Sequence, residues 1–328
     1  MSPQQPLPTV PLGAGGPPVT RVALGLAALG RPAYITTGRA RDLPARSVDD
    51  LADRAHEVLD AAYGAGVRYV DAARSYGRSE EFLAAWLDSR RPADVTVSSK
   101  WGYAYVGDWR LDAEVHEVKD HSLAQLTRQW RETRGHLDGR VALYQVHSAT
   151  RESGVLERRD VLDALAGLRD SGVRVGLSTS GVGQPDTVRA ALDVRAGGEP
   201  VFASVQSTWN LLEPSVGPAL AEAFVAGWAV IVKEGVANGR LTAAGDSGAP
   251  GTPLAVRAQE LGTTPDALAL AAALAQPWVT TVLSGAVTVA QLRSNLAALD
   301  VGAAALDVPD LAEEPAAYWA ARSGRPWT

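Results

Sequence analysis

The sequence predicts a single-domain α/β protein in which eight parallel strands close into a (β/α)8 barrel, the TIM-barrel class. Eight short apolar runs recur along the chain, and a helical pattern follows each run. No glycine-rich GxGxxG turn follows the first run, so an open doubly wound sheet is the less favoured alternative. We therefore expect one barrel domain at 20–328. A Pro/Gly-rich tail at 1–19 precedes it, and is expected to lie across the barrel or to be loosely ordered.

The first half of the chain is expected to supply four strands, each followed by a helix. The apolar run 20–27 predicts the first strand, and a polar loop at 31–47 follows it. Ser47 is a typical N-cap, with Asp49 and Asp50 in the first turn of a helix that ends near residue 63. The other strands of this half are expected at 67–71, 94–99 and 141–146, and the other helices at 79–90, 114–135 and 159–170.

The second half repeats the pattern with four more strands. They are expected at 173–177, 202–206, 228–232 and 279–283, with helices at 184–195, 215–226, 253–261, 265–275 and 288–299. Thr264 as N-cap and Pro265 at the first helical position mark the start of one of these helices. An extra C-terminal helix is expected at 309–322.

Composition narrows the functional classes. The chain carries 37 acidic and 31 basic residues without a basic run, so we expect no nucleic-acid partner. It has no cysteine, and its five histidines lack the HExxH spacing, so we expect no metal site. The N-terminal residues lack the regions of a secretory signal, and no apolar run reaches the roughly 18 residues of a membrane span. We expect a cytoplasmic protein that has no membrane partner.

Four side chains suited to proton transfer lie at or just beyond the ends of predicted strands. Asp71 ends the strand 67–71, Lys100 and His147 end two others, and Tyr76 lies in the loop after Asp71. The carboxyl ends of barrel strands meet at one rim, where the active sites of barrel enzymes lie. An ammonium such as that of Lys100 favours the phenolate form of a nearby tyrosine, and Asp71 can hold the ammonium by a charge-assisted bond. His147 can bind the phenol or a substrate oxygen.

Each of these residues alone has a simpler explanation, as a structural ion pair, a half-buried ring or a core histidine. All four at one rim favour general acid catalysis, in which a phenol protonates an oxygen whose carbon receives a hydride. Because no side chain supplies a hydride, the reaction needs a cofactor.

Several longer stretches resemble a known family. They read VRYVDAARSYGRSEE, VTVSSKWG, ALYQVHS, VGLSTSG, SVQSTWNLLE, ANGRL and VLSGAVTVAQLRSNLAAL, and together they span about residues 20–300. In this order they resemble the aldo-keto reductase superfamily. The resemblance implies a catalytic tetrad of Asp71, Tyr76, Lys100 and His147, with Tyr76 as the proton donor. It also implies that an extended nicotinamide dinucleotide binds at the barrel mouth without a Rossmann domain.

The resemblance also implies where the dinucleotide binds. The implied positions are Ser178, Thr179, Gln206, Lys233, Gly239, Leu241, Ser284, Gly285, Gln291 and Asn295. Ser178 and Gln206 match residues that hold the nicotinamide amide, whereas Thr179 stands where the family usually has asparagine. Lys233 stands where many members have an aromatic residue that stacks on the ring.

The remaining positions belong to the other end of the cofactor. Gly239 and Leu241 match a loop that often covers the pyrophosphate, and the segment 284–295 matches the one that binds the adenosine phosphate. Val287 replaces a common basic residue of that segment, and Arg293 can compensate for it. We therefore expect NADP(H) to be favoured only slightly over NAD(H).

Aromatic residues crowd the loop after Lys100. Trp101, Tyr103 and Trp109 are candidates for a substrate wall, and Trp209 is a candidate from a later strand end. Such walls suit sugars, flat ketones and other small carbonyl compounds. The alternative is that two or three of these rings only pack the loop onto the barrel.

The leading hypothesis is a nicotinamide-dependent carbonyl reductase or sugar dehydrogenase. Two alternatives stay open. A non-catalytic partner protein that senses redox state would bind the dinucleotide without turning over carbonyl compounds. A lyase or isomerase with Lys100 as a Schiff-base nucleophile would be trapped on its substrate by borohydride. The sequence leaves open the physiological substrate, the direction of the reaction and the oligomeric state.

Overall fold

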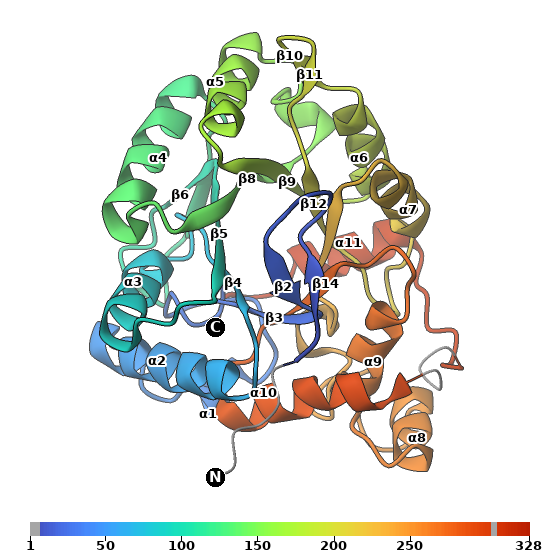
Figure 1. Cartoon of the computed structure of the whole chain (residues 1–328). Coiled ribbons are helices and arrows are strands. Elements are labelled where there is room, and N and C mark those ends of the chain that lie inside the picture. The colour runs from blue at the N-terminus through green and yellow to red at the C-terminus, as the bar shows by residue number, and fades with distance from the viewer. Residues whose placement is uncertain (1–6, 303–306) are drawn as a thin grey trace.

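The computed structural model of the chain describes residues 7–302 and 307–328. Its centre is a closed eight-stranded barrel in which every neighbouring pair is parallel (Figure 1). In sheet order the strands are β3 (Val22–Gly25), β4 (Tyr69–Asp71), β5 (Thr96–Trp101), β8 (Val141–Ala149), β9 (Arg174–Thr179), β12 (Ser204–Thr208), β13 (Ala229–Lys233) and β14 (Thr281–Ser284). The predicted (β/α)8 barrel is therefore confirmed.

Helices form the outer layer between consecutive strands. They are α1 (Arg39–Asp42), α2 (Val48–Gly64), α3 (Ser79–Arg90), α4 (Leu123–Leu137), α5 (Arg159–Asp170), α6 (Gln184–Leu192), α7 (Gly217–Val225), α8 (Pro253–Glu260), α9 (Pro265–Leu274) and α10 (Val289–Leu296). Short 3-10 turns add η1 (Arg151–Ser153), η2 (Ala237–Gly239) and η3 (Ala297–Asp300). Within the described ranges, no helix has both the length and the hydropathy that crossing a membrane requires.

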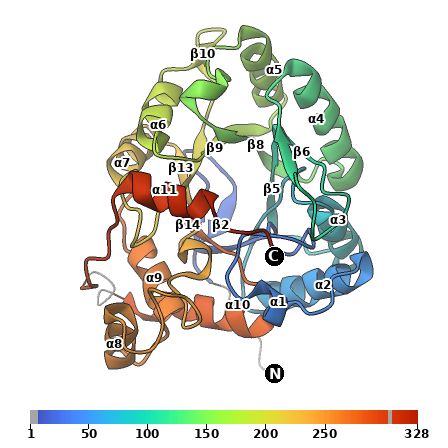
Figure 2. The same cartoon turned by 180° about the vertical axis from the view of Figure 1, so that it is seen from behind.

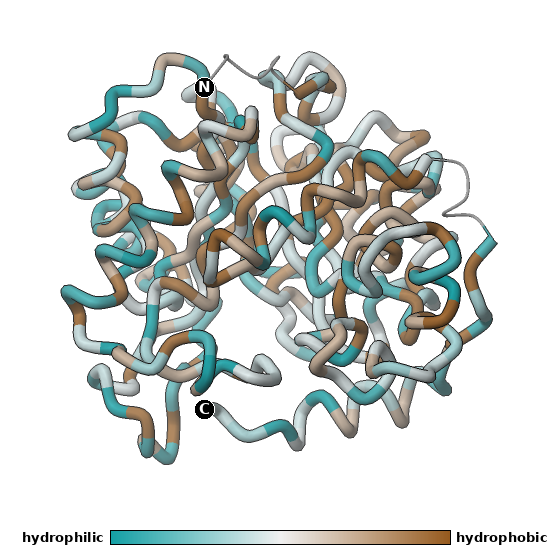
Figure 3. Tube along the Cα trace, turned by 90° about the horizontal axis from the view of Figure 1, so that it is seen from below, coloured by the Kyte–Doolittle hydropathy of each residue, from teal (hydrophilic) through white to brown (hydrophobic). Residues whose placement is uncertain are grey.

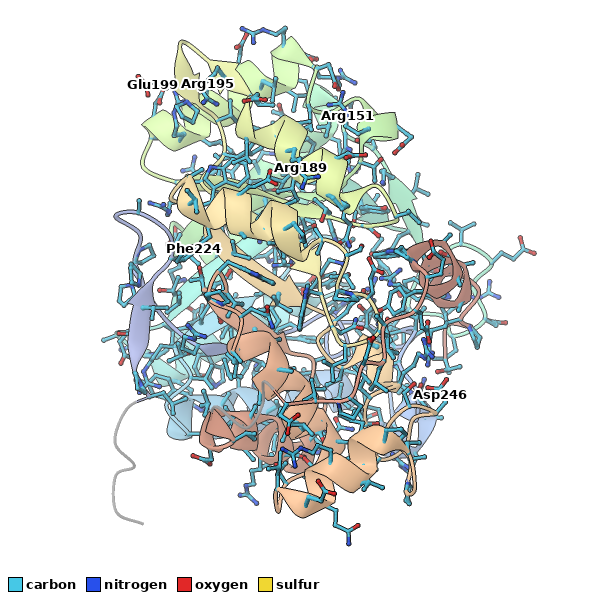
Figure 4. All side chains as sticks on the ribbon, turned by 90° about the vertical axis from the view of Figure 1, so that its right-hand side faces the viewer. Arg151, Arg189, Arg195, Glu199, Phe224 and Asp246 are labelled. Atoms are coloured by element: carbon cyan, nitrogen blue, oxygen red, sulfur yellow. The ribbon has the colours of Figure 1, made fainter. Side chains whose placement is uncertain are left out.

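Burial of both strand faces explains why the strands read as continuous apolar runs rather than as alternating ones. Residues 204–208 of β12 are all buried, and so are residues 229–232 of β13. Figure 3 shows apolar residues gathered toward the interior of the trace and hydrophilic residues on the outer helices. In that outer layer, Arg189 of α6 pairs with Glu222 of α7 at 2.8 Å (Figure 4).

A hairpin closes one end of the barrel. It consists of β1 (Thr9–Pro11) and β2 (Pro18–Thr20), and it covers the barrel end that faces the viewer in Figure 1. It lies in the tail expected at 1–19 and extends one residue beyond it. Leu12 and Val19 are completely buried in a small cluster with barrel residues such as Ile231. Residues 1–6 of the expected tail lie outside the described residues.

The C-terminal helix α11 (Pro315–Ser323) and residues 324–328 lie at the opposite end (Figure 2). The helix begins six residues later than the expected 309–322. Pro315 occupies the first turn, and Glu314 before it is extended, with φ −60° and ψ 127°. Proline disfavours the helical conformation of the residue that precedes it, so the helix cannot continue backwards through Glu314.

The helix expected at 114–135 is wrong in its first part. Residues 117–119 form the strand β7 (Glu117–Lys119), which pairs with β6 (Tyr103–Tyr105), inside the expected loop 101–113. The helix α4 begins only at Leu123, where the Ser122 hydroxyl accepts a hydrogen bond from the Gln125 amide. A second small hairpin, β10 (Arg195–Ala196) with β11 (Glu199–Pro200), shortens the helix expected at 184–195.

Candidate active site

The four predicted catalytic side chains meet at the barrel mouth. Asp71 is the last residue of β4, Lys100 lies in β5 and His147 lies in β8. Tyr76 is held in the turn after β4, where its amide donates to the Ala73 carbonyl at 3.0 Å. The turn continues through Gly77, whose φ of +58° suits glycine.

Lys100 and Asp71 form a fully buried ion pair, with side-chain exposures of 0% and 2%. The Lys100 ammonium also donates to the Ala72 carbonyl at 3.0 Å. The Asp71 carboxylate accepts a 2.7 Å bond from the Ser98 hydroxyl and a 3.1 Å bond from the Gln206 amide. Burial lowers the pKa of Lys100, and the charge of Asp71 acts in the opposite direction. The pair is therefore locked in place beneath Tyr76.

Tyr76 lies between the lysine and the histidine. The Lys100 ammonium is 4.9 Å from the centroid of the phenol ring, and the His147 ring meets it edge-on at 5.4 Å. Burial raises the pKa of Tyr76 well above its usual value, and the charge of Asp71 adds to the effect. The net shift is therefore opposite to the lowering that the sequence suggested for a tyrosine beside Lys100, because burial is the largest cause. At neutral pH Tyr76 carries its proton and can donate it.

His147 is a neutral imidazole. Its Nδ1 lies 3.2 Å from the hydroxyl of Ser75, which is completely buried. Burial lowers the pKa of His147 well below its usual value, and the positive charge of Lys100 lowers it further. Its backbone carbonyl accepts a 2.9 Å hydrogen bond from the His121 ring. A neutral ring fixed through Nδ1 leaves Nε2 as the nitrogen that remains for a ligand.

Arg31 is a residue at this site that the sequence analysis missed. Its guanidinium is only 2% exposed and lies 5.1 Å from the centroid of the Tyr76 ring, 4.6 Å from that of Tyr34 and 4.8 Å from that of Trp327. It pairs with Glu117 at 2.7 Å, which links the loop after β3 to β7. The length of the loop 31–47 was the only feature of the sequence that pointed to a role for this segment. Arg31 itself could not be singled out, because an arginine in a polar loop is usually solvated.

The predicted nicotinamide positions lie on neighbouring strands. Ser178 and Gln206 are register partners in β9 and β12, and both are buried. The Ser178 hydroxyl accepts a bond from the Ser148 amide at 2.8 Å, so its own proton remains to be donated. Gln206 donates to Asp71, while its carbonyl oxygen is buried without a partner among the described residues. The Thr179 hydroxyl has other partners, because it donates to the Gln184 side chain of α6 at 3.2 Å and lies 2.6 Å from the Ser207 hydroxyl.

Two of the predicted adenosine-end residues, Ser284 and Asn295, bond to each other. Ser284 donates to Asn295 at 2.7 Å, and Asn295 in turn donates to Asp266. Gln291 accepts from the Val287 amide at 2.9 Å and donates to Asp42 at 2.8 Å. Gly285 is exposed, and nothing lies within 4 Å of where its Cβ would stand.

Two further predicted cofactor positions follow β13. Gly239 has a φ of +96° and lies close to Thr37 of the loop after β3. Leu241 is completely buried in an apolar cluster with Leu254 and Trp319. The Leu241 side chain is therefore a packing residue, and only its backbone remains for a ligand.

The four aromatic substrate candidates have different surroundings. Tyr103 lies 5.1 Å from the His147 ring and lines a cavity of about 530 Å³ together with Trp327. Trp101 is completely buried against His121 at 5.7 Å, so it is not an open wall. Trp109 is half-buried, and its indole N–H donates to the Arg46 carbonyl at 2.9 Å.

The fourth candidate, Trp209, is only 6% exposed, and its ring packs on Trp278 at 5.9 Å. The expectation that Trp101 and Trp209 form a substrate wall is therefore corrected, because both rings pack the protein interior. For Trp101 this is the alternative expected for the rings of the loop after Lys100.

The sequence pattern of the Aldo/keto reductase family matches residues 45–312, which is more than half of the chain. The chain belongs to the aldo-keto reductase family. This aldo-keto reductase is an oxidoreductase, and members of the family use nicotinamide cofactors and act on small carbonyl compounds. No curated protein gives a significant match.

Solved structures agree with this assignment. A putative aldo-keto reductase from Pseudomonas aeruginosa is 25% identical, with a TM-score of 0.64, and the match covers 91% of this aldo-keto reductase and 96% of the other chain. An aldo-keto reductase from Bacillus halodurans, in its holo form, is 20% identical with a TM-score of 0.63 and 96% of each chain covered. Glycerol dehydrogenase from Gluconobacter oxydans is 21% identical with a TM-score of 0.64, with 92% and 97% covered. The last two likenesses concern the fold alone.

Proposed function

We propose that this aldo-keto reductase interconverts a carbonyl compound and its alcohol, with an aldehyde, ketone or sugar as substrate and Tyr76 as general acid and base. The observation that carries the proposal is the meeting of Tyr76, the Lys100–Asp71 pair and His147 at one barrel mouth. Three strands and one loop, distant in sequence, bring these groups together. An ordinary structural ion pair would not need the phenol and the imidazole beside it.

The buried polar atoms beside Asp71 fit a nicotinamide dinucleotide. The Gln206 carbonyl oxygen, which has no partner within residues 7–302 and 307–328, can accept from the amide of the ring. The Ser178 hydroxyl can donate to the oxygen of that amide. A bound nicotinamide would supply or accept the hydride. The bond from Gln206 to Asp71 fixes the orientation of the glutamine, so the proposed cofactor site and the proposed proton donor share one hydrogen-bond network.

At the adenosine end, we propose a slight preference for NADP(H) over NAD(H). Arg293 is exposed on α10, the helix whose N-terminal turn follows Gly285. A guanidinium there suits a 2′-phosphate. The carboxylate of Asp42, bound to Gln291 of the same helix, opposes an added negative charge and keeps the preference small.

Side chains of the protein itself can donate and take back the proton that the reaction needs. Tyr76 is protonated at neutral pH and can donate to a carbonyl oxygen, after which the neighbouring cations Lys100 and Arg31 stabilise the phenolate. In the reverse direction the phenolate takes the proton of the alcohol. Neutral His147 can hydrogen-bond the substrate oxygen without adding a charge.

The variant Tyr76→Phe tests the proposal. Loss of the hydroxyl removes the proton donor, so turnover of a carbonyl panel is expected to fall by about 10² to 10⁴-fold. The dissociation constant for NADPH, measured by fluorescence titration, is expected to stay within about twofold.

Tyr63→Phe is the matched control, because it removes the same atom from α2, where the hydroxyl donates to Asp94 at 2.9 Å. Full activity of Tyr76→Phe, or dinucleotide binding by the wild type without turnover of any carbonyl compound in the panel, would contradict the proposal.

A further inference from the structure

A charged cluster lies at the end of β13, beside the proposed catalytic residues. The Lys233 ammonium donates to the Thr208 hydroxyl at 2.6 Å and lies 3.8 Å from the Glu234 carboxylate. The Glu234 carboxylate also accepts hydrogen bonds from Nε and Nη2 of the Arg322 guanidinium, and the bond from Nε is 2.8 Å long. Lys233 and Glu234 have side-chain exposures of 15% and 8%. Two cations therefore share one carboxylate, which leaves one positive charge in excess.

Arg322 satisfies Glu234 better than Lys233 does. The arginine forms a two-pronged pair with the carboxylate, whereas the lysine has a single longer contact and a neutral hydroxyl as its close partner. The uncompensated charge of the cluster consequently lies with the Lys233 ammonium.

The barrel register places this ammonium next to the proposed nicotinamide site. Gln206 pairs with Ser178 on one side and with Ile231 on the other, and Lys233 follows Ile231 by two residues on the same strand. Lys233 therefore lies on the strand next to that of Gln206, two residues closer to the barrel mouth. Its charge also contributes to the lowered pKa of His147, so its field reaches the catalytic groups.

We propose that Lys233 makes this aldo-keto reductase discriminate between the two redox states of the nicotinamide. The reduced ring is neutral and the oxidised ring is positive, so an uncompensated ammonium beside the ring repels only the oxidised form. The phosphates of the dinucleotide are the same in both forms, and their attraction to the lysine cancels in the ratio of the two affinities. The inference rests on the proposed function and adds a preference for the reduced cofactor.

The test is the ratio of two dissociation constants, measured by isothermal titration for NADPH and for NADP⁺. In the wild type the reduced form is expected to bind more tightly. Lys233→Met, which keeps the length of the side chain and removes its charge, is expected to lower the ratio of the NADP⁺ constant to the NADPH constant by about tenfold. Lys233→Arg is expected to preserve the ratio, because it preserves the charge.

Arg189→Met is the matched control, since it removes one positive charge from the outer helical layer, where Arg189 pairs with Glu222 (Figure 4). It is expected to leave the ratio unchanged. An unchanged ratio in Lys233→Met overturns the inference, and so does an equal weakening of both forms, which would make Lys233 a phosphate anchor. If the wild type binds neither dinucleotide, the proposed function fails as well.

A pH series gives a second readout. Burial lowers the pKa of Lys233 to about 8, and Lys100 and Arg322 lower it while Glu234 raises it. Deprotonation removes the repulsion, so the ratio is expected to fall as pH rises from 7 to 9 in the wild type. Lys233→Arg stays charged over this range and is expected to show a flat ratio. A wild-type ratio that does not change with pH contradicts the inference.

Discussion

Burial sets the protonation of individual residues around Tyr76. The phenol is held in its neutral, protonated form and the His147 imidazole in its neutral, deprotonated form, since desolvation disfavours the charged form of each. Arg31 is the exception, because the charge of Glu117 raises the pKa of its buried guanidinium against the effect of burial. A protonated donor beside a fixed cation is the state from which a proton can be given to a carbonyl oxygen.

His121 gives a prediction about stability at the scale of one residue. Burial lowers its pKa to about 4, below the ordinary value of 6.5, so the unfolded chain binds this proton more readily than the folded one. Stability is therefore lost as pH falls through this window, by about 2 kcal/mol between pH 7 and pH 5. Urea unfolding at a series of pH values measures the slope.

His121→Gln removes the titrating group and keeps a donor for the His147 carbonyl. The variant is expected to lose about 2 kcal/mol less than the wild type over the same interval. His136→Gln on α4 is the matched control and should follow the wild type. Identical slopes for all three proteins would show that His121 is not the group responsible.

At the scale of elements, local sequence signals predict most of the helices. The helices at 79–90 and 159–170 have the bounds expected from the sequence, and Ser47 forms a full capping box with Asp50. The expected helix 114–135 is wrong over its first nine residues, because β7 exists only through its pairing with β6. Tertiary pairing overrides local preference there, and periodicity cannot reveal a partner strand.

The β1–β2 hairpin gives a prediction at the element scale. Leu12 is completely buried between the hairpin and the barrel strands. Leu12→Ala leaves a cavity in that cluster and is expected to cost about 2–5 kcal/mol of unfolding free energy, measured by urea denaturation. Val225→Ala on α7, where the side chain is 86% exposed, is the control and should change stability by less than about 0.5 kcal/mol. A loss of that small size for Leu12→Ala would mean that the hairpin is not part of the cooperative unit.

Across the whole molecule, the barrel explains which parts of the site were predictable. Asp71 ends β4, and Lys100 and His147 lie within the last three residues of β5 and β8, so closing the barrel is enough to bring them together, although their roles remain predictions. Arg31 and Trp327 come from a loop and from the C-terminal residues, and no period or spacing relates them. Their meeting depends on how α11 crosses the mouth, which a single sequence does not reveal.

Residues 324–328 form a strap over this mouth. Tyr34 and Thr328 exchange backbone hydrogen bonds of 3.2 and 3.1 Å, and Trp327 stacks on His116 with 4.4 Å between the ring centroids. Arg325 bonds the Ile35 carbonyl at 3.2 Å. The strap therefore covers Arg31 and, beneath it, Tyr76.

Deleting residues 324–328 is expected to open the mouth without unfolding the barrel, because the strap adds few buried contacts to the core. The Tyr34 amide would lose its acceptor, and its hydrogen exchange is expected to become more than about tenfold faster. The Leu26 amide donates to the Asp71 carbonyl at 2.9 Å within the barrel. It is the internal control, and its hydrogen-exchange rate should not change. With Trp327 gone from beside Arg31, which itself lies beside Tyr76, bulky ketones should gain in kcat/KM relative to small ones. Faster exchange at both amides would instead mean that the strap holds the whole fold together, and unchanged exchange at Tyr34 would mean that the strap is already open in solution.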